Sequence, residues 1–362
     1  MKTTKYFSGR KQIVVVSTFS GMDIFLLACI KSGLLGAFAV DRNFWACIMH
    51  RANFFHLDGV PIMAPFVEIS EEEYRVSRAD AKTEDTVGKF EEKFVRAPVI
   101  QDYDGRQVRA EVEKIYGKDL IIILIGGPVC YDLTGLNSRK NKGEGSRNNL
   151  MFEYLRFLEE LEPDIALMEQ VPELNQKGNE KLYADFLTQA RTLPYQFAEQ
   201  EMCSLHYGGN QARWRFVMMF IHDKYDTQPV FPEPDLINVK RVRDFLDIDY
   251  FHSGHFVDTW KTKNHFMCTV TSSSPSKFAK AKRTYDPSID DLLLCMDVEQ
   301  GDYHVPEGIP VGQVKMAIGN AVCLSMGTAL IKVILSEILR VKHVGDGFFE
   351  SLEAPNNEEE EL

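Results

Sequence analysis

Apolar and polar positions along the first half of the chain follow a pattern typical of an α/β protein. Apolar runs of strand length alternate with stretches in which apolar residues recur every three or four positions. The predicted strands are QIVVVSTFSG, which ends at Gly21, LLGAFAVD, which ends at Asp41, KDLIIILIGG, PDIALMEQVP and WRFVMMFIH. Predicted helices cover MDIFLLACIKSG and residues 149–160. Such alternation predicts a parallel sheet with helices on both faces, a doubly wound α/β fold.

Two segments interrupt this alternation. Residues 62–98 contain a highly charged stretch, VEISEEEYRVSRADAKTEDTVGKFEEKF, which we interpret as a surface insertion. The alternation is lost again over residues 225–305, which begin with the linker-like DTQPVFPEPD. Helical spacing returns over residues 306–345, before an acidic tail at 346–362. The pattern predicts a main domain over residues 1–224, a second domain over 225–305, and a C-terminal segment that returns to the first.

Composition argues against several classes of protein. The hydrophobic fraction of 44% is sufficient for a substantial core, and no apolar run is long enough to suggest a membrane span. The segment MKTTKYFSGRKQ lacks the apolar region of a secretion signal. The seven cysteines are scattered and form no CxxC pair, which argues against a disulfide framework and a zinc site. We therefore expect a cytoplasmic protein without a bound metal.

Charge is distributed unevenly along the chain. The formal net charge is −12, yet residues 237–283 contain nine Lys/Arg and four Asp/Glu. The loop segment RKNKGEGSR, residues 139–147, contains four basic residues and one acid. Basic clusters in an acidic chain fit either solvated surfaces or contacts with phosphate, and charge alone leaves both interpretations open.

The carboxyl ends of the predicted strands carry the candidate chemistry. Ligands of such sheets bind at this edge, where Gly21, Asp41, Cys130 and Glu169 stand at or just beyond strand ends. Gly21 permits a tight turn, and an acid 20 residues later typically accepts hydrogen bonds from a ribose. Because SGMDIF lacks the GxGxxG of dinucleotide sites, a nucleoside cofactor without a pyrophosphate, such as S-adenosylmethionine, fits better. A purely structural turn remains the alternative at this point.

Five segments, in order, resemble the motifs of the DNA (cytosine-5)-methyltransferase family, of the prokaryotic or phage type. They are FSGMD (19–23), GGPVC (126–130), MEQVPEL (168–174), QARWR (211–215) and AIGNAV (317–322). Five motifs in the right order are more specific than any one of them. The resemblance implies a Rossmann-like, doubly wound S-adenosylmethionine-dependent methyltransferase sheet in a catalytic and cofactor-binding domain, 1–224, with a smaller target-recognition domain at 225–305.

The resemblance also implies an activity, the transfer of a methyl group from S-adenosyl-L-methionine to C5 of cytosine in duplex DNA. A cysteine thiolate adds to C6 of a base flipped out of the helix, which makes C5 nucleophilic. Cys130 matches the family's nucleophile, and Glu169 matches the acid that bonds ring nitrogen N3. Arg213 and Arg215 match the arginines of the Gln-x-Arg-x-Arg motif, of which the last helps to hold cytosine O2.

Further residues take binding roles by the same resemblance. The expected cofactor contacts are Phe19, Gly21, Met22, Asp41, Asp102, Pro128, Asn320 and Ala321. The expected DNA contacts are Arg147 in the basic loop, Gln211, and Lys261 and Lys263 in the basic stretch of the second domain. We expect a monomer that acts on duplex DNA, and the sequence leaves open whether a companion restriction endonuclease exists.

Departures from the family pattern keep alternatives open. Val129 replaces the second proline of Pro-Pro-Cys, and Tyr131 replaces the usual glutamine. Gln170 replaces the asparagine of Glu-Asn-Val. Glutamine is one methylene longer than asparagine, and this extra length could loosen the strand that carries Glu169. One alternative is a catalytically silent member that binds DNA or regulates a partner, and another is an RNA cytosine-5 methyltransferase. A nicotinamide-dependent oxidoreductase would leave Cys130, Glu169 and QARWR unexplained.

Overall fold

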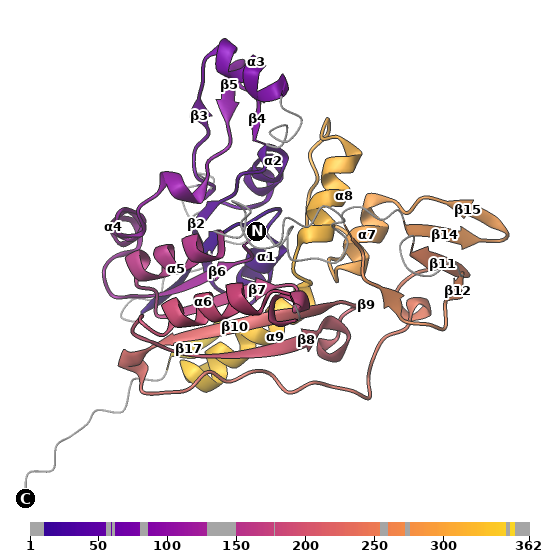
Figure 1. Ribbon diagram of the computed structural model, residues 1–362. Helices are drawn as coiled ribbons and strands as arrows, with labels where there is room; N and C mark the ends of the chain where they lie inside the picture. Colours follow the sequence, from indigo (N-terminus) through magenta and orange to yellow (C-terminus); the bar gives the residue numbers. More distant parts are fainter. Residues whose placement is uncertain are drawn as a thin grey trace, which may run out of the picture.

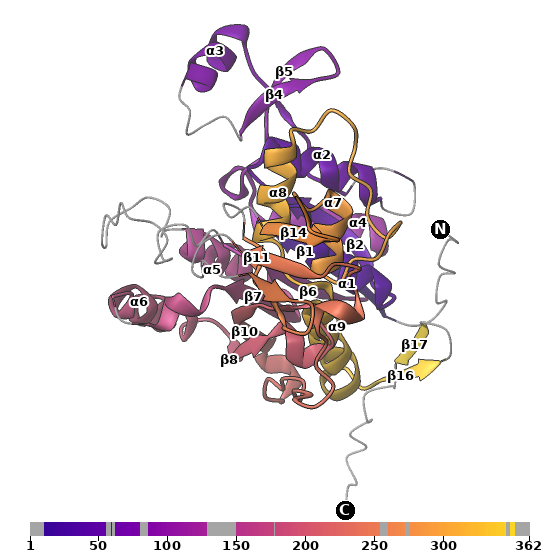
Figure 2. The same cartoon turned by 90° about the vertical axis from the view of Figure 1, so that its right-hand side faces the viewer.

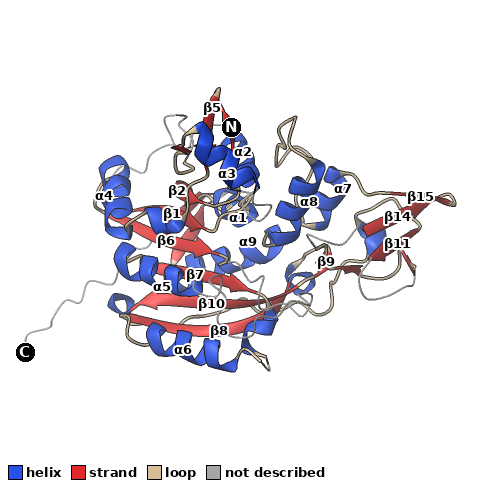
Figure 3. Ribbon diagram, turned by 45° about the horizontal axis from the view of Figure 1, so that its top comes forward, coloured by secondary structure: helices blue, strands red, loops and turns tan. Residues whose placement is uncertain are grey.

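A six-stranded sheet forms the centre of the molecule (Figure 3). The computed structural model describes residues 11–55, 59, 62–79, 86–128, 150–176, 178–253, 260–271, 276–344 and 348–351. In order across the sheet, the strands are β2 Leu35–Val40, β1 Gln12–Thr18, β6 Leu120–Gly126, β7 Ile165–Gln170, β10 Trp214–His222 and β8 Tyr195–Cys203. The first four run parallel, which confirms the core of the predicted α/β arrangement.

The other side of this sheet differs from the fully parallel sheet that the sequence predicts. β10 runs antiparallel to both of its neighbours, β7 and β8. The link from β8 to β10 contains only the short turn η3 Ser204–Tyr207 and the strand β9 Gln211–Ala212. A link without a crossover helix brings a strand back antiparallel. The sequence prediction also missed β8, because that strand reads YQFAEQEMC and lacks an apolar run.

Helices cover both faces of the sheet (Figure 2). The helices α1 Ile24–Lys31 and α9 Leu324–Val333 share one hydrophobic cluster with the odd-numbered residues of β6 and β7. The helices α4 Gly105–Tyr116, α5 Leu150–Leu161 and α6 Glu180–Ala190 share a second cluster with the even-numbered residues. β6 and β7 are buried at every position, which explains their uninterrupted apolar sequences. Helix α5 confirms the helix predicted over residues 149–160.

The charged insertion at 62–98 has regular structure of its own and projects from the sheet (Figures 1 and 2). It contains the strands β3 Val67–Glu68, β4 Val87–Phe90 and β5 Lys93–Arg96, paired in the order β3-β5-β4, and the helix α3 Glu71–Ala79. A small cluster that includes Met63 and Val95 packs it onto Phe44 of helix α2 Phe44–Asn53. The turn η1 Ile100–Asp102 then leads back to the main sheet.

A separate four-stranded sheet lies on the right of Figure 1. Its strands are β12 Lys261–Thr262, β11 Tyr250–Ser253, β14 Ser276–Lys280 and β15 Arg283–Tyr285. The strand β13 Met267–Cys268 pairs with β9 instead and so joins this region to the main sheet. The remaining elements of the region are the turns η4 Asp223–Tyr225 and η5 Val242–Asp244, and the helix α7 Ile289–Cys295.

The C-terminal part of the chain returns to the main sheet. It contains α8 Val311–Asn320, which packs against α2, then α9, the π-turn η6 Ile334–Ile338, and the hairpin of β16 Val341–Val344 and β17 Phe348–Ser351. Among the described residues, the stretch Val311–Ile338 is long and apolar enough to cross a membrane, but 61% of its most apolar window is buried inside the protein. Burial of this kind is typical of a core helix.

Candidate active site at the carboxyl edge of the sheet

The β1–α1 loop, residues 19–23, has an unusual backbone. Phe19, Gly21 and Asp23 all have positive φ, at 51°, 55° and 61°. Glycine adopts this conformation freely, whereas Phe19 and Asp23 do so at a cost that the surrounding structure must offset. A Cβ atom placed on Gly21 would meet nothing within 4 Å, so the space beside it is open. The backbone of the loop at Gly21 is therefore not covered by other described residues on that side.

Asp41 holds this loop from the end of β2. Its Oδ2 accepts the Gly21 N–H at 2.8 Å, and its Oδ1 accepts the Asn43 N–H at 2.7 Å. Burial raises the pKa of Asp41, and these two hydrogen bonds oppose part of that rise. A carboxylate can accept about four hydrogen bonds, so two positions remain for a ribose. The sequence interpretation found the acid but missed that it also fixes the glycine turn.

Glu169 and Arg215 form a buried ion pair beside the end of β6. Arg215 Nε lies 2.5 Å from Glu169 Oε1, and the side chains are only 12% and 10% exposed. The strand register explains the contact, because Glu169 is paired with Val217 and Arg215 points to the same face two residues earlier. A Cβ on Gly127 would lie 3.0 Å from Glu169 Oε2, so the second glycine of GGPVC leaves room for the carboxylate.

Gln170 compensates for its departure from the family pattern. Its Nε2 donates to the Pro128 carbonyl at 2.6 Å, and its Oε1 accepts the Val171 N–H at 3.3 Å. Its side chain is buried, so the bond is shielded from water. The extra methylene therefore does not prevent a tie between β7 and the loop that leads to residue 130, contrary to the loosening that the sequence suggested.

Gln211 and Arg213 are buried within the protein. Gln211 Nε2 donates to the Cys295 carbonyl at 2.7 Å, and its Oε1 accepts the Val270 N–H at 2.8 Å. Arg213 donates to the carbonyls of Val270 and Gly319, at 2.9 and 2.7 Å. Both side chains are 0% exposed. We expected Gln211 at the DNA and Arg213 at the reacting base. In the structure the two side chains tie the QARWR strand to neighbouring segments, and their contacts with DNA and with the base remain predictions.

The other expected cofactor residues lie at or near the same edge. Met22, within the β1–α1 loop, is fully buried in the first cluster, and Phe19 packs partly into the second. Asn320 is the exposed last residue of α8, and Ala321 follows it. Asp102 Oδ2 forms an ion pair with Arg96 at 2.9 Å and accepts the Val99 N–H at 3.1 Å. Asp102 is therefore engaged in its own turn, and its contact with an adenine remains a prediction.

Several predicted residues fall outside the part of the chain that the structure describes. They are Val129, Cys130, Tyr131 and Arg147. Their roles remain predictions from the sequence. Among the described residues, no group of three or more His, Cys, Asp or Glu side chains is arranged to hold a metal ion.

In the described part of the chain, four of the nine basic residues at 237–283 are paired with acids: Arg243, Lys263, Lys277 and Lys280. Lys263 lies 3.4 Å from Asp249, and Lys277 lies 2.7 Å from Asp286. Lys261 instead donates to the Cys268 sulfur at 3.6 Å. Lys282 and Arg283 stand at the turn between β14 and β15 and have no ion pair with another described residue. Both belong to the basic stretch that the sequence suggested for phosphate contact, although only Lys261 and Lys263 were singled out there.

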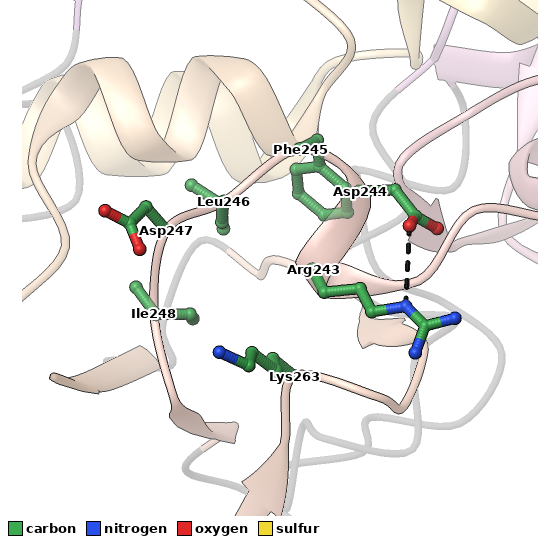
Figure 4. Close-up of a pocket in the computed structure, with 7 residues that line it drawn as sticks. All are labelled: Arg243, Asp244, Phe245, Leu246, Asp247, Ile248 and Lys263. Carbon is green, nitrogen blue, oxygen red and sulfur yellow. Dashed lines mark ion pairs between the residues drawn. The ribbon is translucent and has the colours of Figure 1, made fainter.

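A shallow depression of about 350 Å³ also lies in this region (Figure 4). Its lining runs from Arg243 to Ile248 and includes Lys263. Arg243 and Asp244 form an ion pair of 3.6 Å at its rim. Two cations, Arg243 and Lys263, and two carboxylates, Asp244 and Asp247, line it, and none of its residues comes from the strand ends that carry Asp41 and Glu169. It is a feature of the surface, separate from the candidate active site.

Comparisons with known proteins identify the family of the chain. The family model described as C-5 cytosine-specific DNA methylase matches residues 82–290, more than half of the chain. M.MjaORF1200P of Methanocaldococcus jannaschii, which bears the name of a type II methyltransferase, is 28% identical over 180 residues, 43% of this chain and 48% of that protein. The type II methylase M.HgiDII of Herpetosiphon aurantiacus is 29% identical over 119 residues, 33% of this chain and 32% of that protein. The chain thus matches less than half of the length of either relative.

A solved structure supports the fold. The DNMT2 variant of Spodoptera frugiperda superposes with a TM-score of 0.59 at 15% identity, over 90% of this chain and 100% of that chain. At this identity the likeness concerns the fold alone. Together with the family match, it confirms the predicted Rossmann-like methyltransferase sheet.

Proposed function

Because the chain belongs to the C-5 cytosine-specific DNA methylase family, we propose that it transfers a methyl group from S-adenosyl-L-methionine to C5 of cytosine in duplex DNA. The observation that carries the proposal is the buried pair of Glu169 and Arg215 beside Gly127, at the strand end that leads to Cys130. A carboxylate and a guanidinium held in this way can bond two neighbouring atoms of one flat ring.

The residues at the edge of the sheet fit the cofactor. The open space beside Gly21 can receive the methionine part of the molecule, close to the backbone of the β1–α1 loop. The unused acceptor positions of Asp41 suit ribose hydroxyls, and Ser20 Oγ is a buried polar atom without a hydrogen-bond partner among the described residues. S-adenosyl-L-methionine supplies an activated methyl group on a sulfonium. We assign its binding to Phe19, Gly21, Met22, Asp41 and Pro128, with Asp102, Asn320 and Ala321 at its periphery.

The proposed reaction begins at Cys130. Its thiolate forms a bond to C6 of the target cytosine, and the electron pair of the C5–C6 double bond becomes available at C5. C5 then takes the methyl group. Loss of the C5 proton to a base and departure of the thiolate from C6 restore the aromatic ring. This sequence leaves the cysteine unchanged and adds one methyl group to the base.

Glu169 and Arg215 would stabilise the ring while the thiolate is attached. Negative charge develops on N3 and O2, and a proton held by Glu169 at N3 offsets that charge. Arg215 pairs with the carboxylate at Oε1 through Nε, and its Nη1 donates to the Trp214 carbonyl at 2.7 Å, so the N–H groups of Nη2 would serve cytosine O2. Gln211 and Arg213 contribute by fixing the strand on which Arg215 stands.

The substrate would be duplex DNA with the target base flipped out. A base within the stack cannot reach a thiol in a protein pocket, so the nucleotide must rotate out of the helix. The region at 225–305 would select the sequence, and its basic side chains together with Arg147 would contact phosphate. The type II names of the relatives favour a restriction–modification context, with a companion endonuclease and a cytoplasmic monomer as further parts of the proposal.

Bisulfite sequencing of DNA from cells that express the protein tests this function. We expect protection of cytosine within one recurring short sequence, lost in Cys130→Ala. A duplex with 5-fluorocytosine at that position should form a denaturation-resistant adduct with the wild-type protein. The silent member would be favoured if the DNA stays unmodified and the protein binds DNA but forms no covalent adduct in the presence of S-adenosylmethionine. Methylation of RNA and not of DNA would favour the RNA enzyme.

A further inference from the structure

The β1–α1 loop needs support on its buried side. Its two non-glycine residues with positive φ, Phe19 and Asp23, each hold a backbone conformation that is unfavourable for a residue with a side chain. Asp41 supports the loop at Gly21. Asp23 caps helix α1 at the Leu26 N–H, and its Oδ2 lies 3.2 Å from Nε2 of the fully buried His50. Backbone bonds from Ser20 N–H to the Val40 carbonyl, at 3.2 Å, and from Asp23 N–H to the Ser20 carbonyl, at 2.8 Å, close the turn, and neither of them involves the Met22 carbonyl.

Tyr303 supports the loop at this carbonyl from a distant part of the sequence. Its hydroxyl donates to the Met22 carbonyl at 2.6 Å, across 281 positions of the chain. The phenol is 7% exposed, and burial raises the pKa of Tyr303, which keeps the hydroxyl protonated as a donor. Its ring also packs edge-on against Phe54, at a centroid distance of 6.1 Å. The bond is therefore shielded from water at the point where the loop turns into helix α1.

The segment that carries Tyr303 is itself anchored. We call residues 294–304, which bring the chain back from the second region, the return segment. His304 exchanges two hydrogen bonds of 2.7 Å with the Asn53 side chain, and Asp302 pairs with Lys31 at 2.7 Å. With both neighbours of the tyrosine fastened to α1 and α2, the hydroxyl has a defined position.

The other end of the return segment is fixed to the QARWR strand. Asp297 accepts the Asn210 N–H and the Ser325 hydroxyl, each at 2.5 Å. Gln211 donates to the Cys295 carbonyl in the same place. The return segment thus joins the strand that carries Arg215 to the backbone of the β1–α1 loop.

From these contacts we infer that Tyr303 is a positioning residue for cofactor binding, which holds the β1–α1 loop in its binding conformation through the Met22 carbonyl. The inference rests on the proposed function, since it concerns the same cofactor. It adds the return segment to the cofactor site, although Tyr303 has no contact with the cofactor in this scheme. If the loop is in its binding conformation in only a fraction of the molecules, the apparent Kd equals the intrinsic Kd divided by that fraction. Loss of the Tyr303 hydrogen bond would reduce this fraction and so raise the apparent Kd.

Calorimetry with S-adenosyl-L-homocysteine tests the inference on the full chain. Tyr303→Phe keeps the ring and removes the donor, so Kd should rise about five-fold, as expected for one buried hydrogen bond. Tyr195→Phe is the matched control. That tyrosine is 6% exposed and donates to the Pro163 carbonyl at 2.9 Å, at the amino edge of the sheet. Both variants should lose similar thermal stability, and only Tyr303→Phe should lose cofactor affinity and raise KM for S-adenosylmethionine with little change in kcat.

The outcomes separate this inference from the proposed function. A wild-type protein that does not bind S-adenosyl-L-homocysteine overturns the proposed function. A wild-type protein that binds, with Tyr303→Phe binding equally well, overturns the positioning role alone, and so does an equal loss in Tyr195→Phe. If Tyr303→Phe does not fold, Asp302→Asn loosens the same segment from the surface. It should raise Kd about two-fold, the size expected for an exposed ion pair, and an unchanged Kd would count against the inference.

Discussion

The carboxyl edge of the main sheet and the four-stranded sheet of the second region use charge in opposite ways. At the edge, Glu169 and Arg215 are 10% and 12% exposed and fixed by the strand register. In the second region, Lys263 and Asp249 are 47% and 43% exposed. Buried pairs hold one geometry, whereas exposed pairs contribute little and exchange partners readily. The Glu169–Arg215 pair is suited to contact one base in a fixed geometry. The exposed lysines of the second region are suited to leave an Asp partner and bind a DNA phosphate instead.

We expect the largest effect from a substitution in the Glu169–Arg215 pair. Glu169→Gln keeps the size of the side chain but removes the acid, so the methylation rate should fall by about 10³-fold. Adduct formation on a 5-fluorocytosine duplex should slow in parallel. Glu173→Gln, on the neighbouring turn η2 Pro172–Asn175, is the control and should keep the wild-type rate. Equal losses in the two variants would mean that the change in charge near the strand, and not the acid at N3, is responsible.

The next effect concerns stability at the junction of the two regions. Arg213→Met should lower the free energy of unfolding by about 3 kcal/mol, because it leaves the buried carbonyls of Val270 and Gly319 without these donors. Urea denaturation followed by circular dichroism measures the change. Arg243→Met, at a largely exposed side chain, should change it by less than about 0.5 kcal/mol. An Arg213 variant as stable as the wild type would show that the junction does not depend on these bonds.

A smaller effect tests the space beside the ion pair. Gly127→Ala would place a methyl group 3.0 Å from Glu169 Oε2, which Arg215 prevents from moving freely. We expect the methylation rate to fall about ten-fold, a loss of about 1.4 kcal/mol in transition-state stabilisation. Gly312→Ala, where an added Cβ would meet nothing within 4 Å, should have no effect on the rate. Retention of full activity in Gly127→Ala would show that the carboxylate can shift without loss.

The smallest effect sharpens the exposed side of the comparison. Replacing Lys282 and Arg283 with glutamine should reduce the slope of log affinity against log salt by about one unit for each lost phosphate contact. Lys263→Gln should change the slope less, because Asp249 already offsets that charge. Fluorescence anisotropy with a mixed-sequence duplex at several salt concentrations measures both. A larger change in this slope for Lys263→Gln than for the Lys282 and Arg283 variant would indicate that DNA contacts the other end of this sheet.

Local patterns in the sequence were sufficient for much of the fold. Strands β1, β2, β6 and β7 could be predicted because strands in the middle of such a sheet have nearly unbroken apolar runs. Helix α5 could be predicted because its buried residues recur every three or four positions. The candidate residues Gly21, Asp41 and Glu169 could be found because chemistry in such sheets gathers at the carboxyl ends. The strand β8 could not, since half-buried strands with glutamate and glutamine have no apolar run to identify them.

What the sequence by itself determined is therefore the order of the buried strands and their helices, the family motifs and the chemical groups at the strand ends. Only the tertiary structure decided which of those groups are buried and hydrogen-bonded to other parts of the protein. Gln211 and Arg213 belong to one motif with Arg215, yet only Arg215 meets Glu169. Tyr303 meets Met22 across 281 positions, and Gln170 reaches Pro128 across 42. The periodicity of apolar residues predicts which positions are buried. The hydrogen-bond partner of a buried polar group depends instead on how distant segments of the chain pack, which no local sequence pattern specifies.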